Sequence, residues 1–330
     1  MATLAANVLT LVDWAKRVDP DGKAARIAEL LSQTNDVLMD MVWQEGNLPT
    51  GHRTSVRTGL PTVAWRLLNQ GVAKSKSTTA QIDEAVGILE ARSEVDKDLA
   101  DLNGNTAEFR LSEGSAFLES MNQEMAQTLF YGNHGTAPEE FLGFSTRYSS
   151  LTATNGENVI NAGGTGSDNS SIWLVGWGPQ SVFGIFPKGS SAGLIHEDLG
   201  LGDAFDASNN RFRAYMDRWQ WKSGLALKDW RFAARIANID ISNLVAKSSA
   251  ADLFDTMIKA SHRLPTLNGI RPVYYMNRSC FQMLDIQGRD DVVSGGQLKY
   301  EDVAGHRLAT FRGIPVHVCD ALLENEAVVS

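Results

Sequence analysis

The sequence contains little cysteine and no long hydrophobic run. Its two cysteines, Cys280 and Cys319, cannot form a disulfide framework and suit a reducing compartment. No stretch of about 18 consecutive apolar residues occurs, so we expect no membrane-spanning segment. The N-terminal stretch MATLAANVLTLVDWAKR has no basic residue before its apolar part, which is not typical of a signal peptide. These absences together favour the cytoplasm of a cell as the place where the chain folds.

Basic charge is also scarce. The 330 residues include 30 basic and 39 acidic side chains, a net charge of −9, and no block of basic residues occurs. A nucleic-acid reader that works through a surface patch of Lys and Arg is therefore not expected. The composition of 43% hydrophobic and 21% charged residues is typical of a folded protein, and the length allows about two domains.

The clearest local pattern runs from residue 111 to 131, LSEGSAFLESMNQEMAQTLFY. Apolar side chains recur every three or four residues there, at Phe117, Leu118, Met121, Met125 and Leu129. This spacing predicts a long helix with one apolar stripe. Ser112 is the expected N-cap, and Gly132, within Tyr131-Gly132-Asn133, is the expected stop.

The first 102 residues show no pattern that could enclose a core. Residues 1–40 predict two short helical segments, broken at Asp19-Pro20-Asp21-Gly22, which we interpret as an arm that lies on another surface. In 41–102 we predict two strands, one with Val63, Trp65 and Leu67 on one face and a second containing Ile88, around a polar tip at 71–79. An isolated two-stranded ribbon is marginal in water, so this one needs a surface of its own chain or of a neighbour.

The middle of the chain has β periodicity. After a polar loop at 152–171, residues 172–177 are continuously apolar, as in a strand buried on both faces, and 182–186 is its expected partner. Residues 211–236 alternate between apolar and polar, with a change of phase near Asp229 that predicts a bulge in a long bent ribbon.

Residues 248–330 predict a compact α/β unit. Ser248 or Ser249 is the expected cap of a helix at 250–264 that Pro265 ends. Next come a strand at 273–276, a short helix at 279–286, a loop with Ser294-Gly295-Gly296 and a last strand at 314–318.

One stretch matches a catalytic motif. Residues 189–193, GSSAG, fit the G-x-S-x-G pattern of the hydrolase nucleophile elbow, with Ser191 as nucleophile. That elbow requires a helix after the serine, and the sequel LIHEDLGLGD does not predict one. A tight loop that closes the 182–186 strand is the preferred interpretation.

Other patterns suggest ligand sites only weakly. We interpret His196-Glu197-Asp198 with Asp203 as an acidic loop and not a metal site, and His317 with Cys319 as core packing and not zinc ligation. Gly163-Gly164-Thr165-Gly166 is interpreted as a flexible loop and not a phosphate cradle. Glu139-Glu140 is interpreted as the first turn of a helix. We therefore assign no catalytic, cofactor-binding or metal residue, expect no cofactor, and expect a protein that is not an enzyme.

Several longer stretches resemble the major capsid proteins of tailed bacteriophages, which have the Hong Kong 97 (HK97-like, Johnson) fold. RTGLP at 57–61 with WRLLN at 65–69 resembles the start of that family's extended loop. LFYGN at 129–133 with PEEFLGF at 138–144 resembles the end of its spine helix. WLVGWG at 173–178, PKGS at 187–190 and WRFAARIANI at 230–239 are similar to podovirus-like coat proteins.

The resemblance implies an α+β subunit with four parts. These are an N-terminal arm (1–40), an extended β-ribbon loop (41–102), a peripheral domain (103–240) with a spine helix at 111–131 and long strands at 171–240, and an axial domain (241–330). The long ribbon at 211–240 precedes the compact α/β unit, whereas the family's usual order is the reverse, so a rearranged segment order is expected. The founding member's Lys–Asn cross-link is not carried over to Lys74 or Lys76, because no matching motif surrounds them.

The implied function is a structural one. The resemblance predicts self-assembly into hexamers and pentamers of an icosahedral shell that encloses double-stranded DNA, as part of a virion assembled in the host bacterial cytoplasm. Scaffolding, portal and cement proteins are possible partners, and no membrane is involved. The alternatives are a serine hydrolase that uses Ser191 and an encapsulin-like compartment. In the capsid interpretation, the stripe of the 111–131 helix packs against the 211–240 ribbon.

Overall fold

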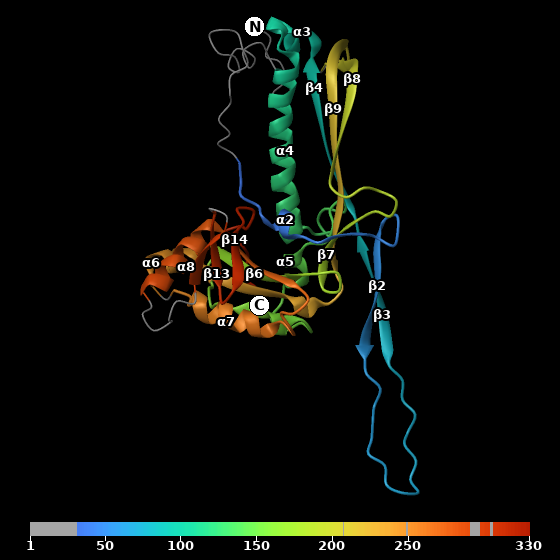
Figure 1. Ribbon diagram of the computed structural model, residues 1–330, viewed down its shortest axis with the longest axis vertical. Coiled ribbons are helices and arrows are strands. Elements are labelled where there is room, and N and C mark those ends of the chain that lie inside the picture. The colour runs from blue at the N-terminus through green and yellow to red at the C-terminus, as the bar shows by residue number, and fades with distance from the viewer. Residues whose placement is uncertain (1–31, 207, 249, 291–297, 304–305) are drawn as a thin grey trace.

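The computed structural model describes residues 32–330 except 207, 249, 291–297 and 304–305. It has an elongated unit along one long helix, a compact unit at the lower end of that helix, and a two-stranded ribbon that projects away from both (Figure 1). The two helical segments predicted within residues 1–40 lie outside the described residues as far as residue 31, and so does the loop at 294–296. Within the described stretch 32–40, helix is confined to the short Val37–Asp40. Among the helices of the described ranges, none is long and apolar enough to cross a membrane.

The helical elements are short apart from three. They are α2 (Val37–Asp40), α3 (Lys97–Ala100), α4 (Thr106–Tyr131), α5 (Phe144–Arg147), α6 (Ile241–Ala246), α7 (Leu253–Arg263) and α8 (Arg278–Asp290), with 3-10 turns η1 (Leu102–Gly104), η2 (Gly156–Asn158) and η3 (Trp230–Phe232).

The strands form one large sheet and one separate ribbon. They are β1 (Trp43–Glu45), β2 (Gly51–Gly59), β3 (Thr78–Ala85), β4 (Gly87–Asp96), β5 (Val159–Asn161), β6 (Asn169–Trp177), β7 (Val182–Phe186), β8 (Leu194–Phe205), β9 (Arg211–Leu227), β10 (Ala233–Asp240), β11 (Arg271–Met276), β12 (Leu298–Val303), β13 (His306–Phe311) and β14 (Ile314–Val318).

Helix α4 begins earlier than its sequence pattern predicts. It starts at Thr106, whose hydroxyl donates to Asp101 at 2.7 Å, so Ser112 lies inside the helix and the predicted N-cap is wrong. Its end at Tyr131 is as predicted, and the Gly132 N–H donates to the carbonyl of Thr128 at 2.8 Å. Of the predicted stripe, Met121, Met125 and Leu129 are buried and Phe117 is half-buried, but Leu118 is exposed.

The stripe of α4 packs against a long three-stranded part of the sheet. Strand β9 pairs antiparallel with β4 on one side and with β8 on the other (Figure 1). Phe117 stacks on Trp219 of β9 with ring centroids 5.4 Å apart, and the Ser223 hydroxyl lies 3.0 Å from the Met125 sulfur. The predicted packing of the stripe on the 211–240 ribbon is confirmed.

The bend of the long ribbon has a cause other than the predicted bulge. Strand β9 ends at Leu227 and β10 begins at Ala233, with the single turn η3 between them. The Asp229 carboxylate accepts the backbone N–H of Arg231 at 3.1 Å and caps this turn. The predicted position of the break near Asp229 is therefore confirmed, but the break is a 3-10 turn and not a bulge.

Strand β6 is the centre of the compact unit. It pairs with β10 on one edge and β11 on the other, and β14 and the β12–β13 hairpin extend the sheet. Every β6 residue is buried, because Trp173 and Trp177 face the core under α4 and α5 while Ile172 and Leu174 face the core under α7 and α8. This two-sided burial explains the continuous apolar run.

Two predictions about the neighbours of β6 are wrong or incomplete. The expected partner β7 meets β6 at one residue pair only and pairs mainly with β9 and β1. The predicted polar loop at 152–171 contains η2, β5 and the beginning of β6. The domain boundary expected after residue 240 stays a prediction, and β10 and β11 on its two sides both pair with β6 in one sheet.

The predictions for residues 248–330 hold for most elements but not for the helix cap. Helix α7 begins at Leu253, and the Asp252 carboxylate accepts the N–H of Asp255 at 3.0 Å, so Asp252 is the cap and Ser248 is not. Helix α6 and the β12–β13 hairpin were not predicted. Strand β14 covers 314–318 as predicted, and the long ribbon precedes this unit, as the sequence order requires.

The extended loop differs most from its prediction. Its paired part is β2 with β3, and residues 60–77 contain no strand, so the strand through Val63, Trp65 and Leu67 is wrong. Ile88 does lie in a strand, but that strand, β4, belongs to the long sheet beside β9. The paired strands of the ribbon therefore end at residue 85.

Candidate assembly surfaces

The tip of the ribbon exposes a group of large apolar side chains. They are Leu60, Val63, Trp65, Leu67, Leu68 and Val72, and the Trp65 side chain is fully exposed. The same segment, 60–77, carries Arg66, Lys74 and Lys76 and no acidic residue. We call it the basic apolar tip. An exposed apolar group of this size on one segment is typical of a surface that binds a partner.

The base of the ribbon is fixed to the body by buried contacts. Both oxygens of Glu84 in β3 accept hydrogen bonds from Arg147 in α5, each at 2.6 Å, and both side chains are largely buried. The His52 ring lies edge-on against Phe183 at 5.5 Å, and burial lowers its pKa, with Lys228 adding to the effect. The base of the ribbon is therefore held in place by the sheet and by α5.

The first described residues form a strap across the compact unit. The buried Asp40 carboxylate accepts hydrogen bonds from Tyr275 at 2.8 Å and from His317 at 2.6 Å, and it pairs with Arg271 at 2.6 Å. Burial alone would raise the pKa of Asp40, but these hydrogen bonds and charges outweigh it and lower the pKa. His317 thus has a structural partner, in agreement with the predicted core role.

The last residues of the chain are anchored by buried hydrogen bonds, like the strap. Glu326 is buried and accepts hydrogen bonds from Tyr131 at the end of α4, from Ser171 in β6, and from Arg235 in β10 at 2.8 Å. Asn238 exchanges two hydrogen bonds with the backbone of Val329, at 2.8 and 2.9 Å. The last residues therefore connect the long helix to the central sheet.

The acidic stretch at 196–203 is a strand and not the predicted loop. His196 and Asp198 lie in β8. Asp198 and Asp217 of the neighbouring β9 both pair with Arg110 of α4, at 2.8 and 2.9 Å. The hydrogen bond from Arg110 lowers the pKa of Asp198. The His196 ring stacks on Trp219 at 5.3 Å. These carboxylates serve to join α4 to the sheet, and no metal-binding group was found among the described residues.

The stretch around Ser191 lacks the geometry of a nucleophile elbow. Within the described stretch 187–205, the serine is exposed in a loop with Gly189 and Gly193 at positive φ, and strand β8 follows it instead of a helix. The predicted tight loop after the 182–186 strand is confirmed.

The remaining candidates also have structural roles. Gly164 donates its N–H to the carbonyl of Asn238, so the 163–166 stretch lies against β10. Both cysteines are buried, and burial raises the pKa of each thiol to about 12. The predicted helical turn at Glu139-Glu140 is wrong, because 138–140 is a turn and α5 begins only at Phe144.

The fold defined by these units is that of a phage capsid subunit. A chain of the bacteriophage JBD30 capsid superposes on this one with a TM-score of 0.50 at 8% identity, covering 89% of this chain and 92% of that chain. The predicted α+β, HK97-like class is confirmed.

The family follows from closer matches. The model of the family "Major capsid protein GP7" matches residues 19–330, and the chain belongs to this family. A chain in a near-atomic structure of bacteriophage Epsilon15 is 32% identical, with a TM-score of 0.80 and coverage of 100% of this chain and 99% of that chain. A search of curated proteins found no match. An encapsulin of Synechococcus elongatus matches with a TM-score of 0.43 at 12% identity, covering 70% of this chain and 96% of that one.

Proposed function

We propose that this major capsid protein assembles with copies of itself into hexamers and pentamers of an icosahedral shell that encloses double-stranded DNA. Its role in that shell is structural and not enzymatic. Self-association into closed symmetric assemblies accumulates many modest interfaces, so no single contact has to be strong.

The observation that carries the proposal is the basic apolar tip. The ribbon projects away from the rest of the subunit (Figure 1). Its six large apolar side chains are exposed and belong to none of the core clusters of the described residues. Exposing them to water costs free energy that burial in an interface would recover, at roughly 25 cal/mol for each Å². A neighbouring copy in a shell supplies such an interface for every subunit.

The two units of the subunit suit different places in a capsomer. We assign the elongated unit, with α4 and strands β4, β8 and β9, to the peripheral position, and the compact unit around β6 to the axial position. In this assignment the spine helix stays in the peripheral domain and the 241–330 segment stays in the axial domain. Strands β6 and β10 also belong to the axial domain, because β6 pairs with both β10 and β11.

The charge of the chain suits a container for DNA. The net charge of −9 would discourage packaged DNA from adhering to the shell wall. Scaffolding, portal and cement proteins are the further partners that such a shell would take, and assembly would occur in the host bacterial cytoplasm before the subunit becomes part of the virion.

The proposal is tested by expressing the full chain and examining it by sedimentation and negative-stain electron microscopy. Closed particles or ring-shaped capsomers are the expected result. A small monomer that reacts with a fluorophosphonate probe at Ser191 would overturn the proposal in favour of the hydrolase.

A further inference from the structure

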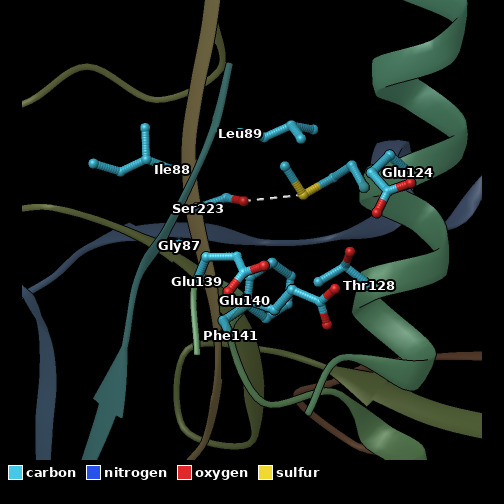
Figure 2. Close-up of a pocket in the computed structure, with 10 residues that line it drawn as sticks. Gly87, Ile88, Leu89, Glu124, Thr128, Glu139, Glu140, Phe141 and Ser223 are labelled. Carbon is cyan, nitrogen blue, oxygen red and sulfur yellow. Dashed lines mark hydrogen bonds between the residues drawn. The ribbon is translucent and has the colours of Figure 1, made fainter. Parts of the chain in front are cut away.

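A small pocket lies where the lower part of α4 faces the beginning of β4. It has a volume of about 170 Å³, and its walls come from α4, from β4 and from the turn at 139–141 (Figure 2). None of the interactions that fix the strap, the ribbon base or the C-terminus uses this pocket.

The floor of the pocket is apolar. Met125 and Phe141 are buried there, and Leu89 packs against the same core. Ser223 is buried as well, and its hydroxyl is satisfied by the Met125 sulfur at 3.0 Å (Figure 2). The floor thus offers van der Waals contact and no free polar group.

The rim of the pocket carries three carboxylates. Figure 2 shows the side chains of Glu124, Glu139 and Glu140 around the same hollow. Glu140 accepts the backbone N–H of Asn133 at 3.3 Å. Within the part of the chain that the structure describes, no Lys, Arg or His forms an ion pair with any of the three. The rim is therefore a local excess of negative charge above an apolar floor.

An apolar floor beneath a carboxylate rim matches the side chain of arginine or lysine. The aliphatic stem of such a side chain covers apolar surface while its charged head stays at the rim, and the guanidinium can bind two carboxylates at once. The described residues form no metal-binding group here. The expected occupant is therefore a basic side chain held by an apolar segment.

The chain itself contains such a segment in its basic apolar tip. Arg66 is exposed there between Trp65 and Leu67, and no described residue pairs with its guanidinium. The ribbon carries this tip away from α4 of its own chain (Figure 1), so the segment and the pocket belong to different copies when they meet. We propose that Arg66 of one copy enters the Glu124–Glu139–Glu140 pocket of a second copy.

This inference rests on the proposed self-assembly and deepens it by naming one contact. In that contact the Arg66 head lies among the carboxylates, and Trp65 and Leu67 cover the apolar residues beside them. The net attraction combines charge complementarity with buried apolar area. The tip has three positive charges and no negative one, which also steers it toward an acidic rim.

Charge reversal tests the contact in the full chain. Particle yield is measured by sedimentation for Glu124→Lys with Glu139→Lys, and separately for Arg66→Glu. Each is expected to lower the yield by about tenfold or more, because like charges then meet at every copy of the contact. The control for the glutamate reversals is Glu94→Lys, at an exposed position of β4 that lies outside the pocket. The control for Arg66→Glu is Lys188→Glu, at an exposed position outside the tip. Both controls are expected to assemble as the unaltered chain does.

The combined variant separates a direct contact from a general charge effect. When Arg66→Glu is added to Glu124→Lys and Glu139→Lys, opposite charges face each other again, so the yield should recover by several-fold over either reversal alone. A second measurement uses Arg66→Cys with Glu124→Cys, since both native cysteines are buried. Mild oxidation of its particles should give a ladder of covalently joined subunits on a denaturing gel.

The outcomes distinguish this inference from the proposed function. If the unaltered chain forms no particles or rings, the proposed function fails and the inference fails with it. If the unaltered chain forms particles while the reversals behave like their controls, or the combined variant does not recover, the inference alone is overturned. Recovery together with the covalent ladder supports it.

Discussion

Arg147 holds Glu84 at two points, with Nη1 and Nη2 each 2.6 Å from one carboxylate oxygen. Glu84 lies in β3 at the base of the ribbon, and Arg147 ends α5. The same guanidinium donates to the carbonyl of Leu225 in β9 at 3.3 Å. One residue therefore joins the ribbon, the connection after α4 and the long sheet, which fixes the direction in which the basic apolar tip leaves the body.

Removing one partner of this pair should destabilise the subunit strongly. Glu84→Ala leaves the Arg147 charge unpaired at a site where its side chain is only 12% exposed. The expected loss is about 3–5 kcal/mol in the free energy of unfolding, measured by denaturant titration of the unassembled subunit. The control is Arg53→Ala, which breaks the exposed ion pair with Asp83 in the same ribbon. Its free energy of unfolding is expected to equal that of the unaltered chain. Equal stability of the two variants would contradict the anchoring role.

The approach of β2 to β3 depends on a glycine at the ribbon base. A Cβ at position 51 would lie 1.9 Å from the backbone carbonyl oxygen of Glu84, whereas at position 71, in the tip, it would meet nothing within 4 Å. Gly51→Ala must therefore move backbone and should destabilise the subunit by about 1–3 kcal/mol. Gly71→Ala should leave the thermal unfolding midpoint unchanged. Equal midpoints for the two variants would show that the strand pairing at Gly51 adapts freely.

The strap contact of Asp40 should make stability depend on pH in a defined direction. Because the pKa of Asp40 is lowered in the folded subunit, its contribution is fully present above the ordinary carboxyl value of 3.8 and is lost as the pH falls through the lowered value. Asp40→Asn should therefore cost the most stability near neutral pH, and its deficit should shrink below about pH 4. Denaturant titrations of the unaltered subunit and of Asp40→Asn at several pH values measure this deficit. The titratable groups that the two proteins share cancel in the difference between their free energies of unfolding. A deficit that stays constant down to acid pH would exclude the linkage.

Local patterns predicted those parts of the fold that local physics determines. Residues 172–177 and 314–318 are strands because their apolar residues fit a buried sheet, and α4 ends at Gly132 because the chain turns there. The start of α4 depends on the contact of Thr106 with Asp101, which a stripe of apolar residues does not encode. Asp252 rather than Ser248 caps α7, where the distant Gln287 side chain accepts the N–H of Leu253 at 3.1 Å.

The assembly surfaces illustrate a different limit. The alternation of Val63, Trp65 and Leu67 is typical of a half-buried strand, yet these side chains find no core within their own chain. The residues that fix the ribbon and the strap, such as Glu84, Arg147 and Asp40, are single charged residues without a motif. Only the fold brings them together with their partners across up to 277 positions, as between Asp40 and His317.

Two tryptophans should separate folding from assembly. Trp219 of β9 is 5% exposed and lies between the rings of Phe117 and His196, at 5.4 and 5.3 Å, so it joins α4 to β8 and β9. Trp65 in the tip touches no core. Trp219→Ala should lower the free energy of unfolding by about 3–5 kcal/mol, because it removes a buried aromatic and leaves a cavity.

Trp65→Ala should have the opposite profile. Its unfolding curve should coincide with that of the unaltered subunit, because a side chain already in water contributes no burial to the folded state. Its particles should form poorly, because the interface between copies loses a large aromatic anchor of the kind that dominates binding energy. Denaturant titration of the unassembled subunit and sedimentation of the assembly reaction measure the two effects separately. If Trp65→Ala assembles normally, the tip is not an assembly surface, and the apolar side chains at its end need another explanation.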